Sequence, residues 1–303
     1  MFTFIFLMIV GGVCGYFLRK LVLLDVMVVI TWLVYALLLF LGVEVGANDV
    51  LMSSLGSIGI AGIIIAVIST LGSCVCAMLL WHWAGKEMSK GVETVNSSIE
   101  KSGSPLKSSM VVLTFFVAGI CLGCFRVFPD DNVRDMSYGV LCVMLFCVGF
   151  GLGCKPAMLK RFSSLSPRLM LLPMATILGT VIACVLLSFF VNYSMASVLA
   201  IGSGFGYYSL SSILISQSIG TEAGTIALLC NIARELMVLL SAPLLLRLFG
   251  PLAPISAGGA TTMDSTLPVI MRTLGEDFVL LSMFHGFLVD FSVPFLVTFF
   301  CSL

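Results

Sequence analysis

Two acidic residues stand in segments that are otherwise apolar or built from small residues. Asp264 lies in GGATTMDSTLP, residues 258–268, and Glu235 lies in CNIARELM, residues 230–237. A carboxylate in an apolar membrane environment costs several kcal/mol unless it is paired, hydrated or protonated, so such a residue is a functional candidate. Burial disfavours the ionised form of a carboxyl group, which makes proton binding feasible near neutral pH.

Two further polar residues accompany Glu235. Asn231, Arg234 and Glu235 occupy positions i, i+3 and i+4 and so follow one face of a helix. Two opposite charges and an amide inside an apolar stretch indicate a polar cavity. The alternative is a self-contained Arg–Glu pair that only holds helices together. Adjacent residues point about 100° apart on a helix, which weakens that pairing and favours another partner for Glu235.

The surroundings of Asp264 also suit a purely structural role. Thr261, Thr262 and Ser265 flank it with N-cap chemistry, and Pro268 suits the first turn of a helix. Asp264 could therefore simply cap that helix, although capping and transport are compatible roles. We include Thr261 and Thr262 among the candidate site residues.

A second segment, residues 202–220, is rich in Gly, Ser and Tyr. Tyr207, Tyr208 and Ser209 could offer hydroxyl groups and ring faces to a cation, whereas aromatic packing at a turn is the alternative. The weaker candidates are Ser203, Asp290, His285, and the two acids that we interpret as interfacial, Glu44 and Asp25.

The composition places these residues in a membrane protein. Of 303 residues, 60% are apolar and only 10% are charged, against about 25% charged in soluble domains. The net charge of zero gives no reason to expect nucleic-acid binding. The eleven cysteines fall mostly in apolar runs and are interpreted as reduced core residues, so neither a metal nor another cofactor is expected. No enzyme motif stands out; the segments of an intramembrane aspartyl protease are absent.

Apolar stretches long enough to cross a bilayer recur along the first two thirds of the chain. The predicted spans are residues 2–18, 21–42, 57–84, 109–128, 138–154 and 169–191. The loops at 85–108 and 155–168 are basic, so the positive-inside rule places them in the cytoplasm and the N-terminus outside.

Residues 1–192 contain an internal repeat. Gly12 and Gly119 are 107 residues apart, and so are Gly72 and Gly179. Each unit, about 1–84 and 109–191, holds three spans. An odd number of crossings inverts the second unit relative to the first, as in secondary transporters. The alternative is that glycine-rich helices resemble each other by chance.

Residues 195–303 form a second pair of units, about 195–250 and 251–303, aligned at an offset of 55 residues. Ser209 then matches Asp264, and Glu235 matches Asp290. Each unit is predicted to contain a re-entrant hairpin, followed by one span at about 223–247 or 277–301. A limb of about ten helical residues reaches roughly 15 Å, half the bilayer. The predicted fold is therefore all-α, with about eight transmembrane helices, two re-entrant hairpins and both termini outside.

The sequence resembles the lysine exporter LysO family of bacterial inner-membrane proteins. The resemblance covers nearly the whole chain and is densest at SGFGYYSLSSILISQSIG, ARELM, GGATTMDSTLPVI and HGF. It implies export of L-lysine and of its toxic analogue thialysine from the cytoplasm. It also implies that transport needs intramembrane acids, which map onto Glu235 and Asp264 here; Asp290 belongs to no recognised family motif.

These observations together predict a secondary transporter whose carboxylates bind a proton or a cationic amino acid, but not both. Proton antiport is the expected coupling, and sodium is the alternative ion. Two other functions stay open: an ion-coupled carrier of another small solute, such as an organic anion, and a membrane scaffold that transports nothing. The oligomeric state, including a homo-oligomer, is not determined by the sequence.

Overall fold

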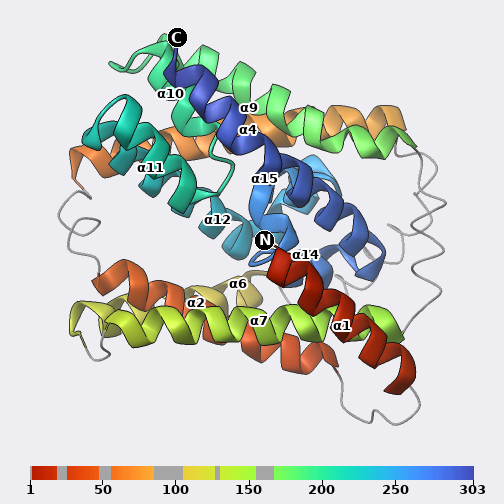
Figure 1. Ribbon diagram of the computed structural model, residues 1–303. Helices are drawn as coiled ribbons and strands as arrows, with labels where there is room; N and C mark the ends of the chain where they lie inside the picture. Colours follow the sequence, from red (N-terminus) through yellow and green to blue (C-terminus); the bar gives the residue numbers. More distant parts are fainter. Residues whose placement is uncertain (1, 19–25, 48–55, 85–104, 127–129, 155–166) are drawn as a thin grey trace.

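The computed structural model describes residues 2–18, 26–47, 56–84, 105–126, 130–154 and 167–303, and every regular element within them is helical (Figure 1). The first helices are α1 (Phe2–Leu18), α2 (Val26–Ala47), α4 (Ser57–Ala84), α6 (Pro105–Cys124), α7 (Asp130–Cys154), the short 3-10 helix η2 (Pro167–Leu171) and α9 (Leu172–Ser188). The all-helical prediction is thus confirmed for the described part of the chain.

Each predicted span of residues 1–192 overlaps one long helix. The clearest shift is in α7, which begins at Asp130 rather than at residue 138. Asp130 and Asp131 fall in its first turn, where negative charge stabilises a helix N-terminus. Among the described residues, the helices that are both long and apolar enough to cross a membrane are Ile58–Ala84, Pro167–Ser188, Thr221–Phe249 and Glu276–Cys301.

The last third of the chain contains two broken helices. The first consists of α10 (Met195–Gly202) and α11 (Tyr208–Ser218), and the second of α13 (Ala253–Gly258), the 3-10 turn η3 (Gly259–Met263) and α14 (Leu267–Leu274). Each is followed by one long helix, α12 (Thr221–Phe249) or, after the 3-10 turn η4 (Glu276–Phe278), α15 (Val279–Cys301). Breaks therefore occur in both segments that the sequence marks as rich in Gly and hydroxyl groups.

The backbone conformation explains why glycine stands at the breaks. Gly206 has φ +90° and Gly259 has φ +60°, values that residues with a Cβ rarely adopt. A Cβ on Gly259 would lie 2.4 Å from the carbonyl oxygen of Phe205. The N–H of Ala260 donates to that same oxygen at 2.9 Å, so the two broken helices touch directly through their backbones.

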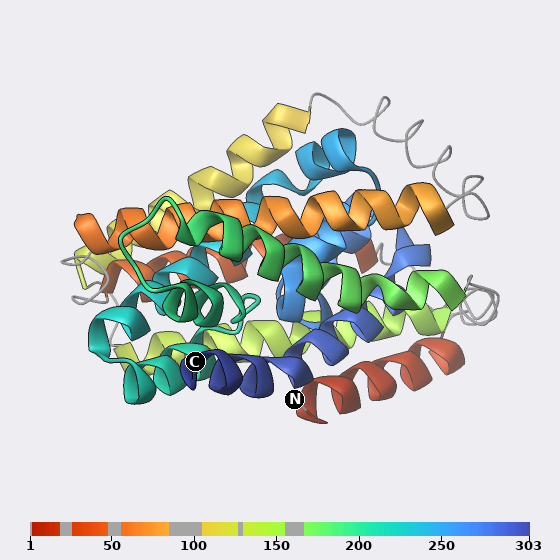
Figure 2. The same ribbon diagram turned by 90° about the horizontal axis from the view of Figure 1, so that it is seen from above.

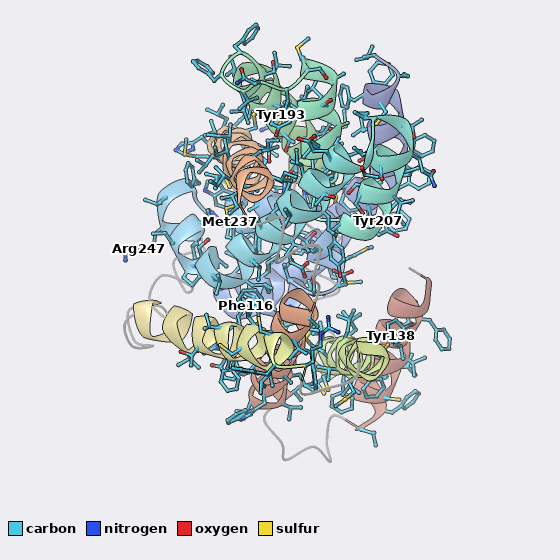
Figure 3. All side chains as sticks on the ribbon, turned by 90° about the vertical axis from the view of Figure 1, so that its left-hand side faces the viewer. Phe116, Tyr138, Tyr193, Tyr207, Met237 and Arg247 are labelled. Atoms are coloured by element: carbon cyan, nitrogen blue, oxygen red, sulfur yellow. The ribbon has the colours of Figure 1, made fainter. Side chains whose placement is uncertain are left out.

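The helices form two groups (Figures 1 and 3). Helices α1, α2, α6 and α7 make one layer, in which α1 packs on α7 and α2 packs on α6. The broken helices, α12 and α15 form the other group together with α4 and α9, which lie side by side (Figure 2). In Figure 3, Phe116 and Tyr138 lie in the four-helix layer, and Tyr207 and Met237 lie in the group that contains the broken helices.

The two groups meet across an apolar core. Buried side chains of the four-helix layer contact buried side chains of the group that contains the broken helices. The residues are Ile30, Val34, Leu37 and Leu38 of α2, Met144, Leu145 and Val148 of α7, and Leu239, Leu267, Met271 and Val279 on the other side.

Candidate substrate and proton site

Helix α12 places a row of buried polar side chains against both broken helices. Asn231, Arg234 and Glu235 are 0%, 1% and 5% exposed. Because they lie at i, i+3 and i+4, the helix presents them along one face. The expected polar face of α12 is therefore present, and it is covered by protein rather than by lipid.

Asn231 holds the break in the first broken helix. Its Oδ1 accepts a 2.8 Å hydrogen bond from the N–H of Gly206, and its Nδ2 donates to Ala227 O at 2.8 Å and to Ser211 Oγ at 3.2 Å. A Cβ on Gly204 would lie 2.3 Å from Asn231 Nδ2. Glycine at 204 thus makes room for the amide that satisfies the broken backbone.

Arg234 holds the end of α13. Its Nε donates to Ala257 O at 2.8 Å and its Nη2 to Ser256 O at 3.2 Å. Weaker contacts reach Ser73 Oγ at 3.4 Å and Thr180 Oγ1 at 3.5 Å. Four of the five N–H donors of a guanidinium therefore have protein acceptors. A cation suits this position because the carbonyl end of a helix carries partial negative charge.

The ring of Phe205 completes the surroundings of Arg234. The guanidinium carbon lies 5.2 Å from the ring centroid, within the range of a cation–π contact. Phe205 is fully buried and has φ +47°, so the break in the first broken helix directs this ring onto α12. The sequence analysis did not single out Phe205, because a phenylalanine among many in an apolar chain gives no signal.

Glu235 and Asp264 are brought together by Ser265. The hydroxyl of Ser265 donates to Glu235 Oε1 at 2.5 Å. The N–H of Ser265 donates to Asp264 Oδ1 at 2.6 Å, and its Oγ lies 3.4 Å from the same oxygen. One residue therefore contacts both carboxylates, and Glu235 has the separate partner that its position on the helix led us to expect.

Asp264 lies between η3 and α14, where the backbone leaves helical geometry. Its φ and ψ are −135° and −98°. The capping residue of α14 is Thr266, and no side chain caps this helix. Simple N-capping by Asp264, which the sequence left open, is therefore not what the structure has.

The threonines before Asp264 bond inside the protein. Thr261 Oγ1 donates to Gly258 O at 2.9 Å and lies 3.2 Å from Thr266 Oγ1. Thr262 Oγ1 lies 3.0 Å from Ser282 O and 3.1 Å from His285 Nδ1. Both hydroxyls fix the turn of the second broken helix against its neighbours.

His285 belongs to a chain of hydroxyl groups on the far side of this turn. Its Nε2 lies 2.8 Å from Thr176 Oγ1, which lies 2.8 Å from Ser256 Oγ. Ser256 Oγ donates to Ser73 O at 3.0 Å. These contacts tie α15, α9 and α4 to α13. Thr176, Ser256 and Ser73 were not predicted, because single hydroxyl residues in apolar helices are common.

Four remaining candidates lie on α15 or at the break between α10 and α11. Asp290 is half-buried on α15 and lies within electrostatic range of Asp264. Tyr207 is half-buried at the start of α11 and lies within range of Asp264 and Asp290. Tyr208 is half-buried on α11, and Ser203 is buried at the end of α10.

Some sequence-based candidates cannot be placed. The side chains of Ser209 and Glu44 lie outside the described residues, and so does Asp25. Within the segments that the structure describes, no three His, Cys, Asp or Glu residues gather where they could hold a metal ion.

Comparison with known proteins gives a consistent result. The model of the family described as "Lysine exporter LysO" matches residues 5–98 and 113–301. The chain is 31% identical to the lysine exporter LysO of Escherichia coli K12, over 99% of each chain. It is 32% identical to a putative lysine exporter of Haemophilus influenzae over 63% of this chain and 97% of the relative. No solved structure matches the chain significantly.

Proposed function

Because this chain belongs to the lysine exporter LysO family, a family of membrane transporters and not of enzymes, we propose that it exports L-lysine from the cytoplasm in exchange for protons. The toxic analogue thialysine is proposed as a second substrate, since it keeps the charges and length of lysine. The observation that carries this proposal is the contact of Glu235 and Asp264 with one residue, Ser265.

The carboxylate pair suits the charge of the substrate. Lysine has two ammonium groups and one carboxylate at neutral pH, so its net charge is positive. Two ionised acids attract this cation, and protonation of the acids weakens that attraction. Protons and lysine would therefore bind in turn, which is the minimum requirement for antiport. Asp290 lies close enough to Asp264 to add to the negative field.

Asn231 and Arg234 are proposed to act mainly by positioning the broken helices. Their bonds to Gly206, Ser256 and Ala257 fix the backbone around the acids. Thr261 and Thr262 are proposed to hold the turn that carries Asp264.

The lysine carboxylate needs other donors. The start of α11 carries partial positive charge near Tyr207, which suits a carboxylate. Tyr207, Tyr208 and Ser209 are proposed as the nearest side-chain partners of the substrate.

The proposed inverted repeat is supported by equivalent glycine contacts. A Cβ on Gly72 would lie 2.4 Å from Gly179 O, and one on Gly179 would lie 2.4 Å from Gly72 O. These two glycines correspond across the offset of 107 residues. A pair of equivalent residues that contact each other reciprocally is the arrangement expected on a two-fold axis.

The four-helix layer adds a second set of matched contacts. Helix α1 packs on α7, and the corresponding helices α6 and α2 also pack together. Gly12 lies against Gly149 in the first pair, and Gly119 lies against Gly42 in the second. These contacts are related by the same offset, which supports inverted units at about 1–84 and 109–191.

The two broken helices are proposed as re-entrant hairpins at residues 195–220 and 251–275. Their longest limb, α11, has 11 residues and reaches roughly 16 Å, half the thickness of the hydrocarbon core. Both termini then lie on the outer side of the inner membrane. Arg247 and Arg272 are exposed, which agrees with a cytoplasmic position for the last turns of α12 and α14 (Arg247 is labelled in Figure 3).

Alternating access is proposed to come from movement of the hairpin-bearing group against the four-helix layer. The cluster between them consists of buried apolar side chains. Apolar contacts are not directional, so one layer can move along the other and form new contacts of the same kind. This movement would carry Glu235 on α12 and Asp264 in the second hairpin together.

Transport by the purified protein in lipid vesicles tests the function. Labelled lysine inside the vesicles should leave faster when the outside is made acidic, and thialysine should compete. An organic anion that leaves instead of lysine would identify another carrier. Vesicles that release nothing under any gradient would favour a scaffold, and dependence on sodium rather than pH would change the coupling ion.

A further inference from the structure

On the basis of the proposed function, we infer that Ser265 bridges Glu235 and Asp264 so that the two acids share a single proton. One proton is then exchanged for one lysine, and the exchange moves no net charge across the membrane. Neither Ser265 nor the stoichiometry was predicted from the sequence.

The geometry of the bridge favours a single proton on the pair of acids. The Ser265 hydroxyl donates to Glu235 Oε1 at 2.5 Å, while its Oγ lies 3.4 Å from Asp264 Oδ1. A hydroxyl has one proton to donate and lone pairs to accept with. With one proton on the pair, protonated Asp264 can donate to Ser265 Oγ while Ser265 donates to ionised Glu235. A second proton, on Glu235, would leave the serine hydroxyl a neutral acceptor in place of a charged one, and that hydrogen bond is weaker.

The charge balance follows from this singly protonated state. Two ionised acids carry two negative charges, so the pair with one shared proton carries one. The pair with lysine, whose net charge is one positive, also carries one. The proton leaves to cytoplasmic water when lysine enters, and another enters from the outside when lysine leaves. The pair of acids with its bound proton or lysine therefore has the same net charge in both directions of movement.

Four other charged or titratable groups lie near the pair or its turn in the described part of the chain. Arg234 is committed to carbonyl groups of α13, and His285 is held between Thr176 and Thr262. Asp290 on α15 and Tyr207 at the start of α11 lie within electrostatic range of Asp264. One-for-one exchange requires that each of these groups keeps one charge state, so that none adds a second proton to the count.

The experiment measures the lysine gradient at which net flux stops in vesicles of pure lipid. With a fixed pH difference and the potential clamped by potassium and valinomycin, one-for-one exchange predicts that about a tenfold lysine gradient balances one pH unit. This balance point should not move with the potential. A balance point near a hundredfold, or one that shifts with the potential, would overturn the one-proton bridge but leave proton-driven export intact. Flux that ignores the pH gradient would overturn both.

Three serine variants test the role of Ser265 itself. Ser265→Ala should lower proton-driven efflux at least about tenfold, because a hydrogen bond to a charged group is lost. It should also change the pH profile. Ser265→Thr keeps the hydroxyl and should restore both. Ser188→Ala is the matched control, because that hydroxyl donates only to Val185 O within α9.

A second readout separates the bridge from a structural role. Exchange of labelled for unlabelled lysine needs no proton and should fall less in Ser265→Ala than proton-driven efflux does. Equal loss of both, with no rescue by threonine, would mean that Ser265 only supports the fold. An unchanged pH profile in Ser265→Ala would also contradict the bridge.

Discussion

The guanidinium of Arg234 donates a 2.8 Å hydrogen bond to the backbone carbonyl of Ala257, at the last turn of a six-residue helix. This bond links a residue in the middle of the longest helix to a carbonyl that a continuous helix would satisfy itself. A buried charge therefore stabilises a break in the backbone. The carboxylates beside it depend on that break for their position.

Arg234→Gln should destabilise the protein by about 2–5 kcal/mol, because buried carbonyl groups lose charged donors. Unfolding in detergent solution measures the effect. Arg272→Gln is the matched control; this arginine is exposed on α14, and its loss should change stability by less than about 0.5 kcal/mol. Equal stability of the two variants would mean that the bonds of Arg234 contribute little.

Glu235→Gln and Asp264→Asn should each lower lysine efflux at least about 30-fold. The reason is that removing the acid from a buried pair of carboxylate and substrate ammonium costs about 2 kcal/mol or more. Both variants should still insert in the membrane, because each keeps the shape of the side chain. Vesicle efflux and membrane content are the measurements. Glu222→Gln serves as the control, because Glu222 is exposed in the first turn of α12. Normal efflux by either acid variant would remove that acid from the mechanism.

Gly204→Ala should impair both folding and transport. The new Cβ would lie 2.3 Å from Asn231 Nδ2, and such overpacking costs about 1–3 kcal/mol. Adding Asn231→Ala should recover part of the stability but no transport, because Gly206 then loses its acceptor. Gly139→Ala is the control, because nothing lies within 4 Å of a Cβ added at this position. The stability of this helix should rise by up to about 1 kcal/mol.

Gly72→Ala and Gly179→Ala should each destabilise the protein by about 1–3 kcal/mol. The reason is that each Cβ would meet the carbonyl oxygen of the other glycine at 2.4 Å. Gly72→Ala should cost more, because its Cβ would also lie 2.4 Å from Ala183 Cβ. The double variant should cost less than the sum, because one separation of α4 from α9 relieves both clashes. Unfolding free energies of the single and double variants give the answer. A single variant that loses no stability would argue against the reciprocal contact of the two glycines.

Much of the helical framework was accessible from the sequence because it follows from local rules. Long apolar runs must be helical in a membrane, so helices overlap each of the six predicted spans in residues 1–192. The segments around Gly204 and Gly259 were recognised as broken because glycine and hydroxyl residues cluster there. Helix α7 begins before the predicted span, at Asp130, because its acidic first turn was interpreted as loop.

The contacts of the site were less accessible. Sequence spacing put Asn231, Arg234 and Glu235 on one face of a helix, but it could not say that two of them hold backbone breaks. Ser265 follows Asp264 directly, yet nothing local links it to Glu235. The contacts of Thr176 with Ser256 and of Phe205 with Arg234 join segments far apart in the chain.

The sequence by itself determined that this protein belongs in a membrane and that its elements are helical. It also identified the two acids whose position in an apolar environment makes them functional candidates. Hydrophobicity and helix periodicity are properties of neighbouring residues, so a linear reading is enough for them. Only the tertiary structure decided that Glu235 and Asp264 meet through one serine. This contact depends on how α12 packs against the turn between η3 and α14. That packing is set by buried contacts between residues distant in sequence.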